Sequence, residues 1–455
     1  MLRFFKVNDP YLLVVVFLLL IAVRTVGIFV DLPMLEPQFK WLLLGERLGE
    51  GFRMYSETFD YTGPLAAYAY KLVDVILGRS WLGHQALATV IVMIQAGFLN
   101  IILLRNGAFN ENNYFPAFFY ILVASAIPDG YSLSPQLMSL TFILLSLNNI
   151  FRRIDNEVQD ELFLYAGLYL GIAILFYLPA VVYFVVLLSS LLLFSSPAAR
   201  GLMLFFYGLI VPIMIAFCYF YWYGAHWAFI DSYLLRGILD TRSYNMGMVG
   251  LLISASLMLF LFVLSVLSVL SKGRYANFQT KIQQVMILTI GGGILAMLVS
   301  VELGPSQLIL FVPALSFFLS HYVLLLRRPF FQWTIPYLVV AGLIFFPYMS
   351  FHKTSLQLPE PTGSTQEKLL YFGRDITRYQ PYRMGSPFLD QKLSAEWLKK
   401  LDYYQPAARI QDNLLASDPD VIIDDLGVVS KLFFRFPQLE ARYERRGSNY
   451  YKVED

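Results

Sequence analysis

The sequence predicts an α-helical polytopic membrane protein with about eleven transmembrane helices and a small α/β extracytoplasmic domain at its C-terminal end. Three observations predict this class. Of the 455 residues, 57% are hydrophobic and 15% are charged, against about 45–50% and 25% in soluble domains. The mean hydropathy is +0.58. Apolar runs of nearly membrane-spanning length recur up to residue 351, and the composition then becomes that of a soluble domain.

Charge and cysteine content exclude two classes of function. Lys+Arg number 34 and Asp+Glu 32, a formal net charge of +2, so the chain lacks the basic excess that nucleic-acid binding requires. We therefore expect no nucleic-acid partner. The single cysteine, Cys218, cannot form an internal disulfide or a cysteine-ligated metal cluster. A divalent metal stays open, but oxygen ligands and the four histidines would have to hold it.

A hydrocarbon core about 30 Å thick needs about 20 apolar residues in a helix. The expected spans are 10–30, 81–104, 114–128, 132–150, 162–177, 179–196, 202–223, 247–270, 284–301, 307–326 and 333–351. The first span is too long for a cleaved signal peptide and is expected to be an anchor. The fifth and sixth separate only at Tyr177-Leu178-Pro179, where the proline could instead kink one longer helix.

The distribution of cations in short loops predicts the orientation. With a cytoplasmic N-terminus, the short outside loops contain only Arg236 and Arg242. The inside loops then contain Arg3, Lys6, Arg105, Arg152, Arg153, Arg200, Lys272, Arg274, Lys281, Arg327 and Arg328. An odd number of spans places the C-terminal hundred residues outside. The expected location is the bacterial inner (plasma) membrane, with a periplasmic or extracellular C-terminal domain.

The predicted organisation is a transmembrane domain, 1–352, and a soluble extracytoplasmic domain, 353–455. Residues 31–80 form the first extracytoplasmic loop, in which 39–48 has the spacing of a helix lying in the membrane interface. In the C-terminal domain, 393–401 and 428–443 are predicted helices, the second broken near Pro437. Residues 421–423 and 450–453 are predicted strands.

The first outer loop contains the candidate catalytic carboxylates Asp31, Glu36 and Asp60. A carboxylate at the membrane surface, where a lipid-linked substrate arrives, can act as general base towards an acceptor hydroxyl or amine. The structural alternative is that Asp31 and Glu36 are solvated loop acids. Asp60 precedes Gly63-Pro64, so it could equally belong to a turn that enters a helix.

Three residues of loop 224–246 are candidates for binding a lipid phosphate: Arg236, Arg242 and His226. An arginine can hold a phosphate with two parallel hydrogen bonds. This is the only cationic short outer loop and it breaks the positive-inside trend, which favours a functional role. The alternative is that these arginines pair with lipid headgroups or acids.

The order of residues in the first loop resembles the GT-C superfamily of glycosyltransferases that use polyprenyl-phosphate sugars, including its protein O-mannosyltransferase and aminoarabinose-transferase branches. The matching features are Arg24, Asp31 and Glu36, then 45–51, Tyr55, 60–65 and 77–80. In that family an acidic pair follows the first helix and a Pro-Pro-Leu turn enters the next one. Here Leu35 and Glu36 stand at the pair, and Gly63-Pro64-Leu65 replaces the turn. The family's basic or histidine-containing patch has no counterpart at residues 304–307.

The resemblance implies a GT-C-like fold and an inverting transferase that moves a sugar from a polyprenyl-phosphate donor to an acceptor on the outer face of the membrane. The implied partners are the polyprenyl-phosphate-linked sugar, a lipid, glycan or protein acceptor, and membrane lipids. Two alternatives remain open. A non-catalytic assembly or scaffold protein would explain the missing basic patch. A transporter or flippase would need polar residues within the spans, for which Gln95, Asn100 and Gln136 are the candidates.

Overall fold

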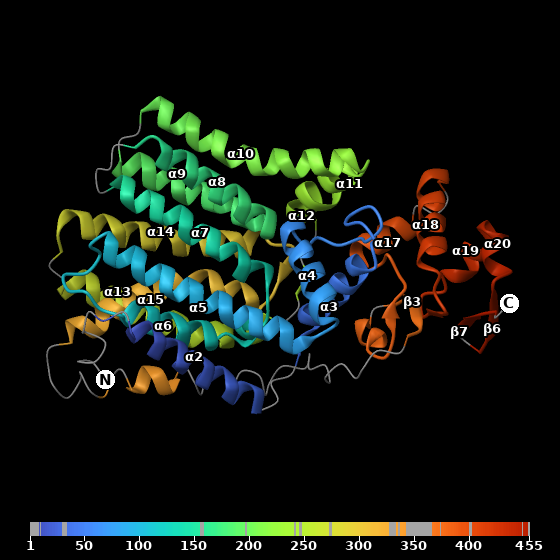
Figure 1. The fold of residues 1–455 in the computed structure, drawn as a ribbon, viewed down its shortest axis with the longest axis horizontal. Helices are drawn as coiled ribbons and strands as arrows, with labels where there is room; N and C mark the ends of the chain where they lie inside the picture. The colour runs from blue at the N-terminus through green and yellow to red at the C-terminus, as the bar shows by residue number, and fades with distance from the viewer. Residues whose placement is uncertain are drawn as a thin grey trace. The chain divides into compact units, whose positions relative to one another are not determined.

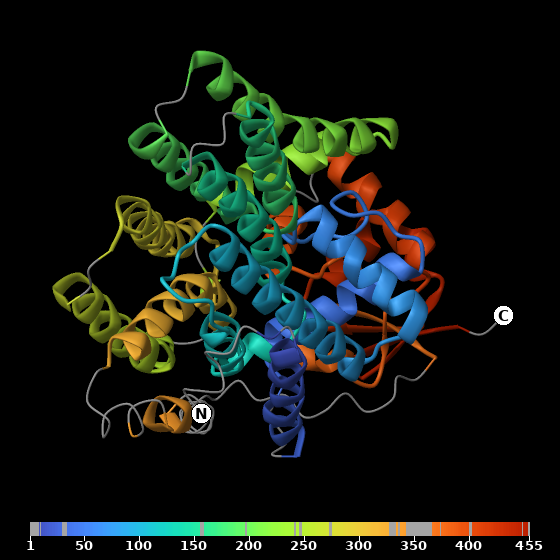
Figure 2. The same ribbon diagram turned by 60° about the vertical axis from the view of Figure 1, so that its left-hand side comes forward.

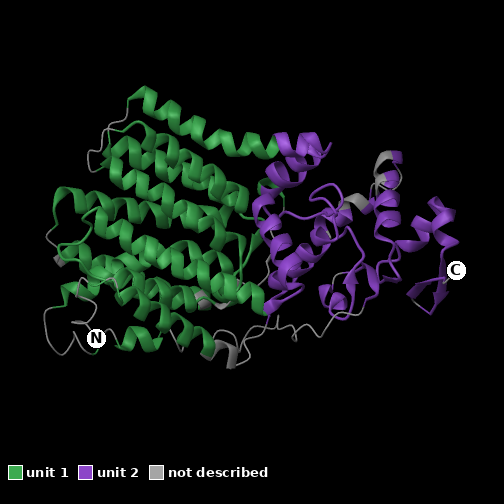
Figure 3. Ribbon diagram, in the orientation of Figure 1, with its two compact units in different colours: residues 1–32, 82–217, 238–356 green, residues 33–81, 218–237, 357–455 purple. Residues whose placement is uncertain are grey.

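The apolar runs of the sequence fold as helices in the computed structural model (Figure 1). The structure describes residues 9, 11–29, 34–154, 159–195, 198–240, 243–244, 248–272, 275–326, 334, 337–342, 366–373, 375–399, 403–447 and 449–453. The chain divides into two compact units (Figure 3). Unit 1 contains residues 1–32, 82–217 and 238–356, and unit 2 contains residues 33–81, 218–237 and 357–455. The first loop thus packs with the C-terminal residues, while the division at residue 352 stays a prediction about folding domains.

Unit 1 is a helical bundle. Its elements, wholly or for most of their length, are α2 (Tyr11–Phe29), α5 (Trp81–Arg105), α6 (Phe115–Ser125), the 3-10 helix η1 (Pro128–Tyr131), α7 (Pro135–Ile154), α8 (Glu161–Phe176), the 3-10 helix η2 (Leu178–Val182), α9 (Tyr183–Phe194), α10 (Ala199–Trp222), α13 (Met248–Lys272), α14 (Asn277–Val299), the 3-10 helix η4 (Pro305–Phe311) and α15 (Val312–Leu325). Helix α7 packs on α8, and α15 packs against both α6 and α13 (Figure 1, Figure 2). A short parallel pair joins β1 (Ser243–Tyr244) to β2 (Glu302–Leu303).

Six helices of the described residues are long and apolar enough to cross a membrane: α5, α7, α10, α13, α14, and η4 with α15. Shorter apolar helices cover the first, third, fifth and sixth predicted spans. The predicted count of about eleven is therefore not confirmed. Of the eleventh predicted span, 333–351, the structure describes only Thr334 and residues 337–342, which are helical. The break between the fifth and sixth spans is present, because Tyr177 is extended and η2 begins at Leu178.

Small and polar residues join the helices of unit 1. A side chain at Gly167 of α8 would place its Cβ 2.0 Å from the Phe205 carbonyl oxygen of α10, so only glycine permits this helix contact. Arg24 of α2 is buried and donates to the Thr89 hydroxyl and the Gly130 carbonyl. These bonds fix α2 against α5 and η1.

Unit 2 combines the first loop with an α/β arrangement near the C-terminus. Its helices include α3 (Glu36–Gly49), α4 (Pro64–Leu77), α11 (His226–Ala228), the π-helix η3 (Phe229–Leu235), the 3-10 helix η5 (Ile376–Tyr379), α17 (Gln391–Lys399), α18 (Tyr404–Ser417), α19 (Val429–Arg435) and α20 (Pro437–Glu440); α12 (Arg236–Leu239) begins in it. The strands β3 (Lys368–Phe372), β4 (Arg383–Met384), β5 (Val421–Asp424), β6 (Tyr443–Arg446) and β7 (Asn449–Lys452) form one sheet in the order β4-β3-β5-β7-β6.

The sheet is mixed. Strand β3 is parallel to both β4 and β5, and β7 is antiparallel to β5 and β6. Its core contains Leu370, Ile422, Leu432 and Phe433, and it also takes in Phe59 from the first loop. The predicted strands 421–423 and 450–453 and the helix break near Pro437 lie at β5, at β7 and between α19 and α20.

The predicted helix of the first loop is present as α3, but its predicted surroundings are wrong. All residues from Pro37 to Leu48 are buried in protein. A helix lying in the membrane interface would keep a polar face towards water. Close packing on α4 explains the difference, since a Cβ on Gly45 would lie 2.8 Å from the Tyr70 carbonyl oxygen.

Candidate functional site

Helix α3 begins at Glu36, and Pro37 follows it in the first turn. The Gln38 side chain accepts a hydrogen bond from the Leu35 backbone N–H at 3.1 Å, which closes the helix end. A carboxylate in the first turn is favoured by the helix dipole, and proline is tolerated there because its missing N–H would have no helical partner. The local sequence therefore holds Glu36 in a defined position.

The Glu36 carboxyl has an altered acidity. Burial raises its pKa, the Lys40 ammonium lowers it, and the Asp375 carboxylate raises it. The net direction is upward, which brings the group towards the range in which a carboxylate can accept a proton effectively.

One turn further along α3, Lys40 joins two acids from distant parts of the sequence. Its Nζ lies 2.6 Å from an Asp60 carboxylate oxygen and 3.1 Å from an Asp390 carboxylate oxygen. The Asp60 side chain is fully buried, and those of Lys40 and Asp390 are 11% and 12% exposed. A buried lysine held by two carboxylates is strongly constrained, because removing the lysine or the carboxylates would leave a buried charge without its partner. We call Glu36, Lys40, Asp60 and Asp390 the Lys40 cluster.

A strained turn holds Asp60. Tyr55 has a φ of 65°, a left-handed conformation that is uncommon for a bulky residue. Its backbone N–H donates to the Thr58 carbonyl at 2.9 Å and its hydroxyl to the Thr62 carbonyl at 2.7 Å. The Thr62 N–H and hydroxyl in turn donate to the Asp60 carboxylate. Strain of this kind persists only where the surroundings over-determine it, which is typical of functional sites.

Asp390 is held equally firmly at the entry of α17. Its carboxylate accepts the Lys392 and Leu393 backbone N–H groups at 2.9 and 3.1 Å, a helix cap. Its backbone N–H donates to the Phe59 carbonyl at 3.0 Å, and the Phe59 N–H donates to the Pro387 carbonyl at 2.8 Å. The loops carrying Asp60 and Asp390 are thus joined by backbone hydrogen bonds.

A second ionic network lies on α3 beyond the Lys40 cluster. Glu46 lies 3.6 Å from Arg79 and 3.5 Å from Arg383. Arg79 also donates to the Tyr382 and Tyr379 carbonyls at 2.8 and 2.9 Å. These contacts fix the segment between β3 and β4 onto α3.

The other predicted site residues are placed differently. Arg236 forms an ion pair with Asp231 at 3.0 Å, and the His226 ring packs against those of Tyr221 and Trp227. Asp31 and Arg242 lie outside the described residues. The structure thus joins Asp60 to the neighbourhood of Glu36, and the assignments of Arg236, Arg242 and His226 to a phosphate stay predictions.

The sequence analysis missed Lys40 and Asp390. The signal for Lys40 was present: a lone cation within an apolar helical run, four residues after Glu36. Asp390 carried only the signal of a helix cap after Ser386-Pro387. Nothing in the local sequence connects Asp390 to Asp60.

The Lys40 cluster could also bind a metal ion. Asp60 and Asp390 offer carboxylate oxygens within 4.8 Å of one another, and hard divalent cations prefer such ligands. In the structure the Lys40 ammonium bridges these oxygens, so a cation there would compete with it.

The candidate transport residue Gln95 has an internal structural role. Its amide donates to the Leu137 carbonyl at 2.6 Å and the Thr141 hydroxyl at 2.8 Å, and its oxygen accepts the Tyr120 hydroxyl at 2.8 Å. Interhelical bonds of this kind hold membrane helices together.

Comparisons with known proteins give structural relatives only. No protein-family model matches the chain, and no curated protein matches its sequence. Among solved structures, it is similar to ArnT from Cupriavidus metallidurans bound to undecaprenyl phosphate, with a TM-score of 0.52, 11% identity, and coverage of 94% of this chain and 89% of that one. The apo state of the same ArnT gives a TM-score of 0.49 at 10% identity, covering 92% and 88%. The oligosaccharyltransferase AglB from Archaeoglobus fulgidus, in complex with an inhibitory peptide and a dolichol-phosphate, gives 0.42 at 8%, covering 89% and 59%.

Proposed function

Since the chain has the fold of the GT-C superfamily, we propose that it is an inverting membrane glycosyltransferase that takes a sugar from a polyprenyl-phosphate donor. The acceptor is a lipid, glycan or protein on the outer face of the membrane. The observation that carries the proposal is the Lys40 cluster, which places a carboxyl of raised pKa beside a fixed lysine in the first loop.

In this proposal Glu36 is the general base. It removes the proton from an acceptor hydroxyl or amine, whose oxygen or nitrogen attacks the anomeric carbon of the donor sugar. The bond between that carbon and the phosphate oxygen breaks, and the polyprenyl phosphate leaves with the bonding electrons. Inversion follows because the nucleophile enters opposite the leaving group. Asp31, which stands earlier in the same loop, is the alternative base.

Lys40, Asp60 and Asp390 position and tune this base. Lys40 lowers the Glu36 pKa against the effect of burial, which favours the carboxylate form that accepts a proton. Asp60 and Asp390 hold the ammonium in place through their ion pairs. If a divalent cation binds at these carboxylates, it supplies positive charge for the phosphate.

The donor phosphate is assigned to Arg236, Arg242 and His226. The negative charge that grows on a departing phosphate must be met by fixed donors. In this proposal Arg236 exchanges its partner Asp231 for the phosphate when the donor binds.

The proposal is tested with the full chain in nanodiscs and a radiolabelled polyprenyl-phosphate sugar. Wild type should release and transfer label, and Glu36→Gln should reduce turnover by about 10²- to 10⁴-fold. Glu57→Gln is the matched control, because that carboxylate of the same loop accepts the Arg53 N–H and lies outside the Lys40 cluster. Equal turnover of Glu36→Gln and wild type would remove the base assignment. Donor turnover absent from the wild type with every acceptor class would favour the scaffold alternative.

The proposed orientation has a cytoplasmic N-terminus and a periplasmic or extracellular C-terminal domain in the bacterial inner membrane. Gln366 is exposed and suits a labelling test after Cys218, the sole cysteine, is replaced by serine. A Gln366→Cys protein should react with an impermeant maleimide from the outside of intact cells. Reaction only in inside-out vesicles would reverse the orientation.

A further inference from the structure

Helix α4 is apolar on two opposite sides. Its inner side packs on α3, where Tyr70 stacks on Trp41 with the ring centroids 6.0 Å apart. On the outer side, Leu72, Val75 and Ile76 are 61%, 65% and 67% exposed. These three residues share one face, because positions three and four apart in a helix are neighbours. A helix that is apolar on both sides is stable when both sides are covered, and α3 covers only the inner one.

The outer side of α4 continues into an aromatic surface at the end of α10. The hydroxyl of Tyr68, one turn before Leu72, donates to the Tyr219 hydroxyl at 2.8 Å. One turn after Tyr219 along α10 comes Trp222, which is 85% exposed. All of these residues belong to unit 2. We call Tyr68, Leu72, Val75, Ile76, Tyr219 and Trp222 the α4–α10 surface.

Both parts of this surface are attached to helices that are long and apolar enough to cross a membrane. Helix α5 begins at Trp81, four residues after α4 ends at Leu77, so the chain between them reaches at most about 14 Å. Tyr219 and Trp222 lie in the last turns of α10 itself. Its exposed side chains change from aliphatic ones such as Ile215 to these aromatic ones. Tyrosine and tryptophan are enriched where a helix leaves the hydrocarbon core.

The two charged residues of α4 fit the same surroundings. Lys71 stands next to Leu72, and a lysine there can lay its stem on apolar surface and extend its ammonium to lipid phosphates. The Asp74 carboxylate points towards α3, since a Cβ on Gly49 would lie 2.5 Å from it. The charge beside the exposed side of α4 is therefore positive.

We propose that the α4–α10 surface lies in the interfacial layer of the lipid bilayer and anchors unit 2 to it. Helix α4 then has the position that the sequence predicted for residues 39–48. A protein partner would have to displace lipid from a surface attached to two apolar helices of membrane-spanning length. Because α4 begins four residues after Asp60, the anchor would hold the Lys40 cluster close to the lipid headgroups. The proposal requires insertion in a membrane and does not depend on sugar transfer.

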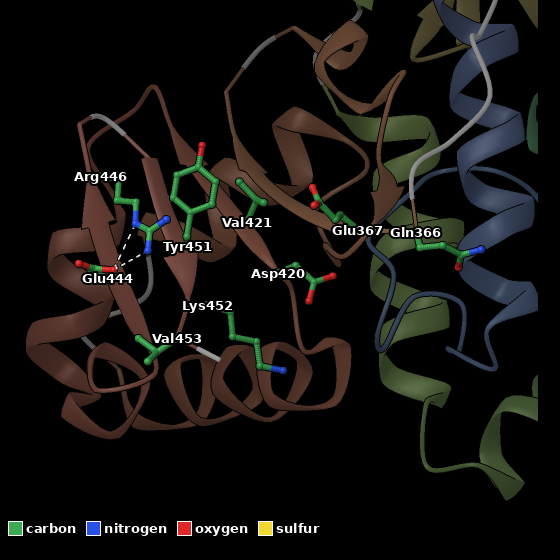
Figure 4. Close-up of a pocket in the computed structure, with 9 residues that line it drawn as sticks. All are labelled: Gln366, Glu367, Asp420, Val421, Glu444, Arg446, Tyr451, Lys452 and Val453. Carbon is green, nitrogen blue, oxygen red and sulfur yellow. Dashed lines mark hydrogen bonds and ion pairs between the residues drawn. The ribbon is translucent and has the colours of Figure 1, made fainter. Parts of the chain in front are cut away.

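Another surface of unit 2 has the opposite character and supplies a control. A hollow of about 890 Å³ beside β5, β6 and β7 has charged residues of both signs in its lining (Figure 4). They are Glu367, Asp420, Glu444, Arg446 and Lys452. Arg446 pairs with Glu444 at 2.9 Å, and both side chains are exposed. Charged surface of this kind belongs in water, so a probe at Glu444 should report a part of unit 2 that lies outside lipid.

The test uses the full chain with Cys218→Ser in nanodiscs of phosphatidylcholine and phosphatidylglycerol. Spin labels are attached to single cysteines in Leu72→Cys, Ile76→Cys, Trp222→Cys and, as the control, Glu444→Cys. Power saturation compares collisions with oxygen, which concentrates in lipid, and with a nickel chelate, which stays in water. The first three labels should lie about 5–10 Å into the boundary between headgroups and acyl chains, and the control label should lie in water.

A cysteine scan of residues 65–77 separates a helix lying in the interface from one crossing the bilayer. The depth should rise and fall with a period of about 3.6 residues around a constant mean. A steady change of depth along α4 would overturn the proposal. Labels at Leu72 and Ile76 that collide with the nickel chelate as often as the control label would also overturn it. Low collision with both reagents would indicate cover by protein, and dipolar broadening between labels would indicate a second copy of the chain; either result would overturn the proposal.

Trp222→Phe keeps the test valid if the labelled proteins fold poorly, because it is a mild change at an exposed position. The tryptophan emission of wild type minus that of the variant isolates Trp222. Lipids brominated near the headgroup end of their chains should quench this difference more strongly than lipids brominated near the chain ends. Absence of quenching, or stronger quenching by the deeper bromines, would contradict an interfacial position.

Discussion

The buried carboxyl of Glu46 gives the most quantitative prediction of the structure. Glu46 is 4% exposed on α3, and its partners Arg79 and Arg383 lie at 3.6 and 3.5 Å. Burial raises its pKa from 4.5 to about 7; Arg79 and Arg383 lower it, and the neighbouring acids Asp74 and Glu50 raise it. Burial thus outweighs two arginines that are not in close contact.

The sign of the effect on stability follows from linkage. An acid whose pKa is higher in the folded state binds more protons folded than unfolded, so stability falls as pH rises through the window from 4.5 to about 7. At 1.36 kcal/mol per pH unit, a pKa raised from 4.5 to about 7 corresponds to about 3 kcal/mol. Glu46→Gln removes this dependence. The free energy of unfolding of the variant, relative to that of wild type, should therefore rise by about 2.5 kcal/mol when the pH is raised from about 5 to about 8.5.

The assay compares unfolding of the two proteins in the same detergent at both pH values, by pulse proteolysis in urea. The difference between proteins, followed between pH values, cancels the titrating groups that do not interact with Glu46. Glu440→Gln is the control, because it removes a carboxylate at an exposed position of unit 2 and its difference from wild type should be the same at both pH values. The reasoning would be refuted if the stability of Glu46→Gln relative to wild type were the same at both pH values. It would also be refuted if this relative stability fell as the pH rises.

Three further perturbations follow from the packing and charges described above. Lys40→Met should lower stability by about 3–5 kcal/mol because it leaves two buried carboxylates without their ion-pair partner, and adding Asp390→Asn should recover part of that stability in urea unfolding. Lys40→Met should also move the acid limb of the pH–rate profile to higher pH. Gly45→Ala should cost about 1–3 kcal/mol through overpacking on α4, whereas Gly97→Ala, with no atom within 4 Å of the new Cβ, should leave stability unchanged or raise it by up to about 1 kcal/mol. Arg236→Lys should weaken donor binding nearly as much as Arg236→Ala, because the planar fork is lost; equal donor affinity in both variants and wild type would remove this arginine from the site.

Much of the local structure could be predicted from the sequence. The apolar runs form helices because a segment surrounded by lipid must bond its backbone groups within itself. Helix α4 begins at Pro64 after Gly63, as the turn signal predicted, and β5 and β7 lie at the predicted apolar strands. The number of spans was less secure, because a short apolar helix buried in protein has the same composition as one that crosses lipid.

The candidate site was only partly predictable. Glu36 and Asp60 could be named as candidates because a carboxylate in a loop at the membrane surface can act as a general base. The surroundings of α3 could not, since its polar residues Gln38, Glu46 and Arg47 would face water on any local reading and are buried in the fold.

The sequence by itself determined the apolar helices and the strands β5 and β7, because hydrophobic spacing, prolines and caps act within a few neighbours; β3 and α18 were not predicted. The tertiary structure alone decided that Lys40 meets Asp60 and, 350 positions away, Asp390. A charge pair of such separation has no local signal, because either acid would satisfy its local role, in a turn or in a helix cap, without the lysine. Only the backbone bonds between Phe59 and the loop before α17 bring the two carboxylates to one ammonium.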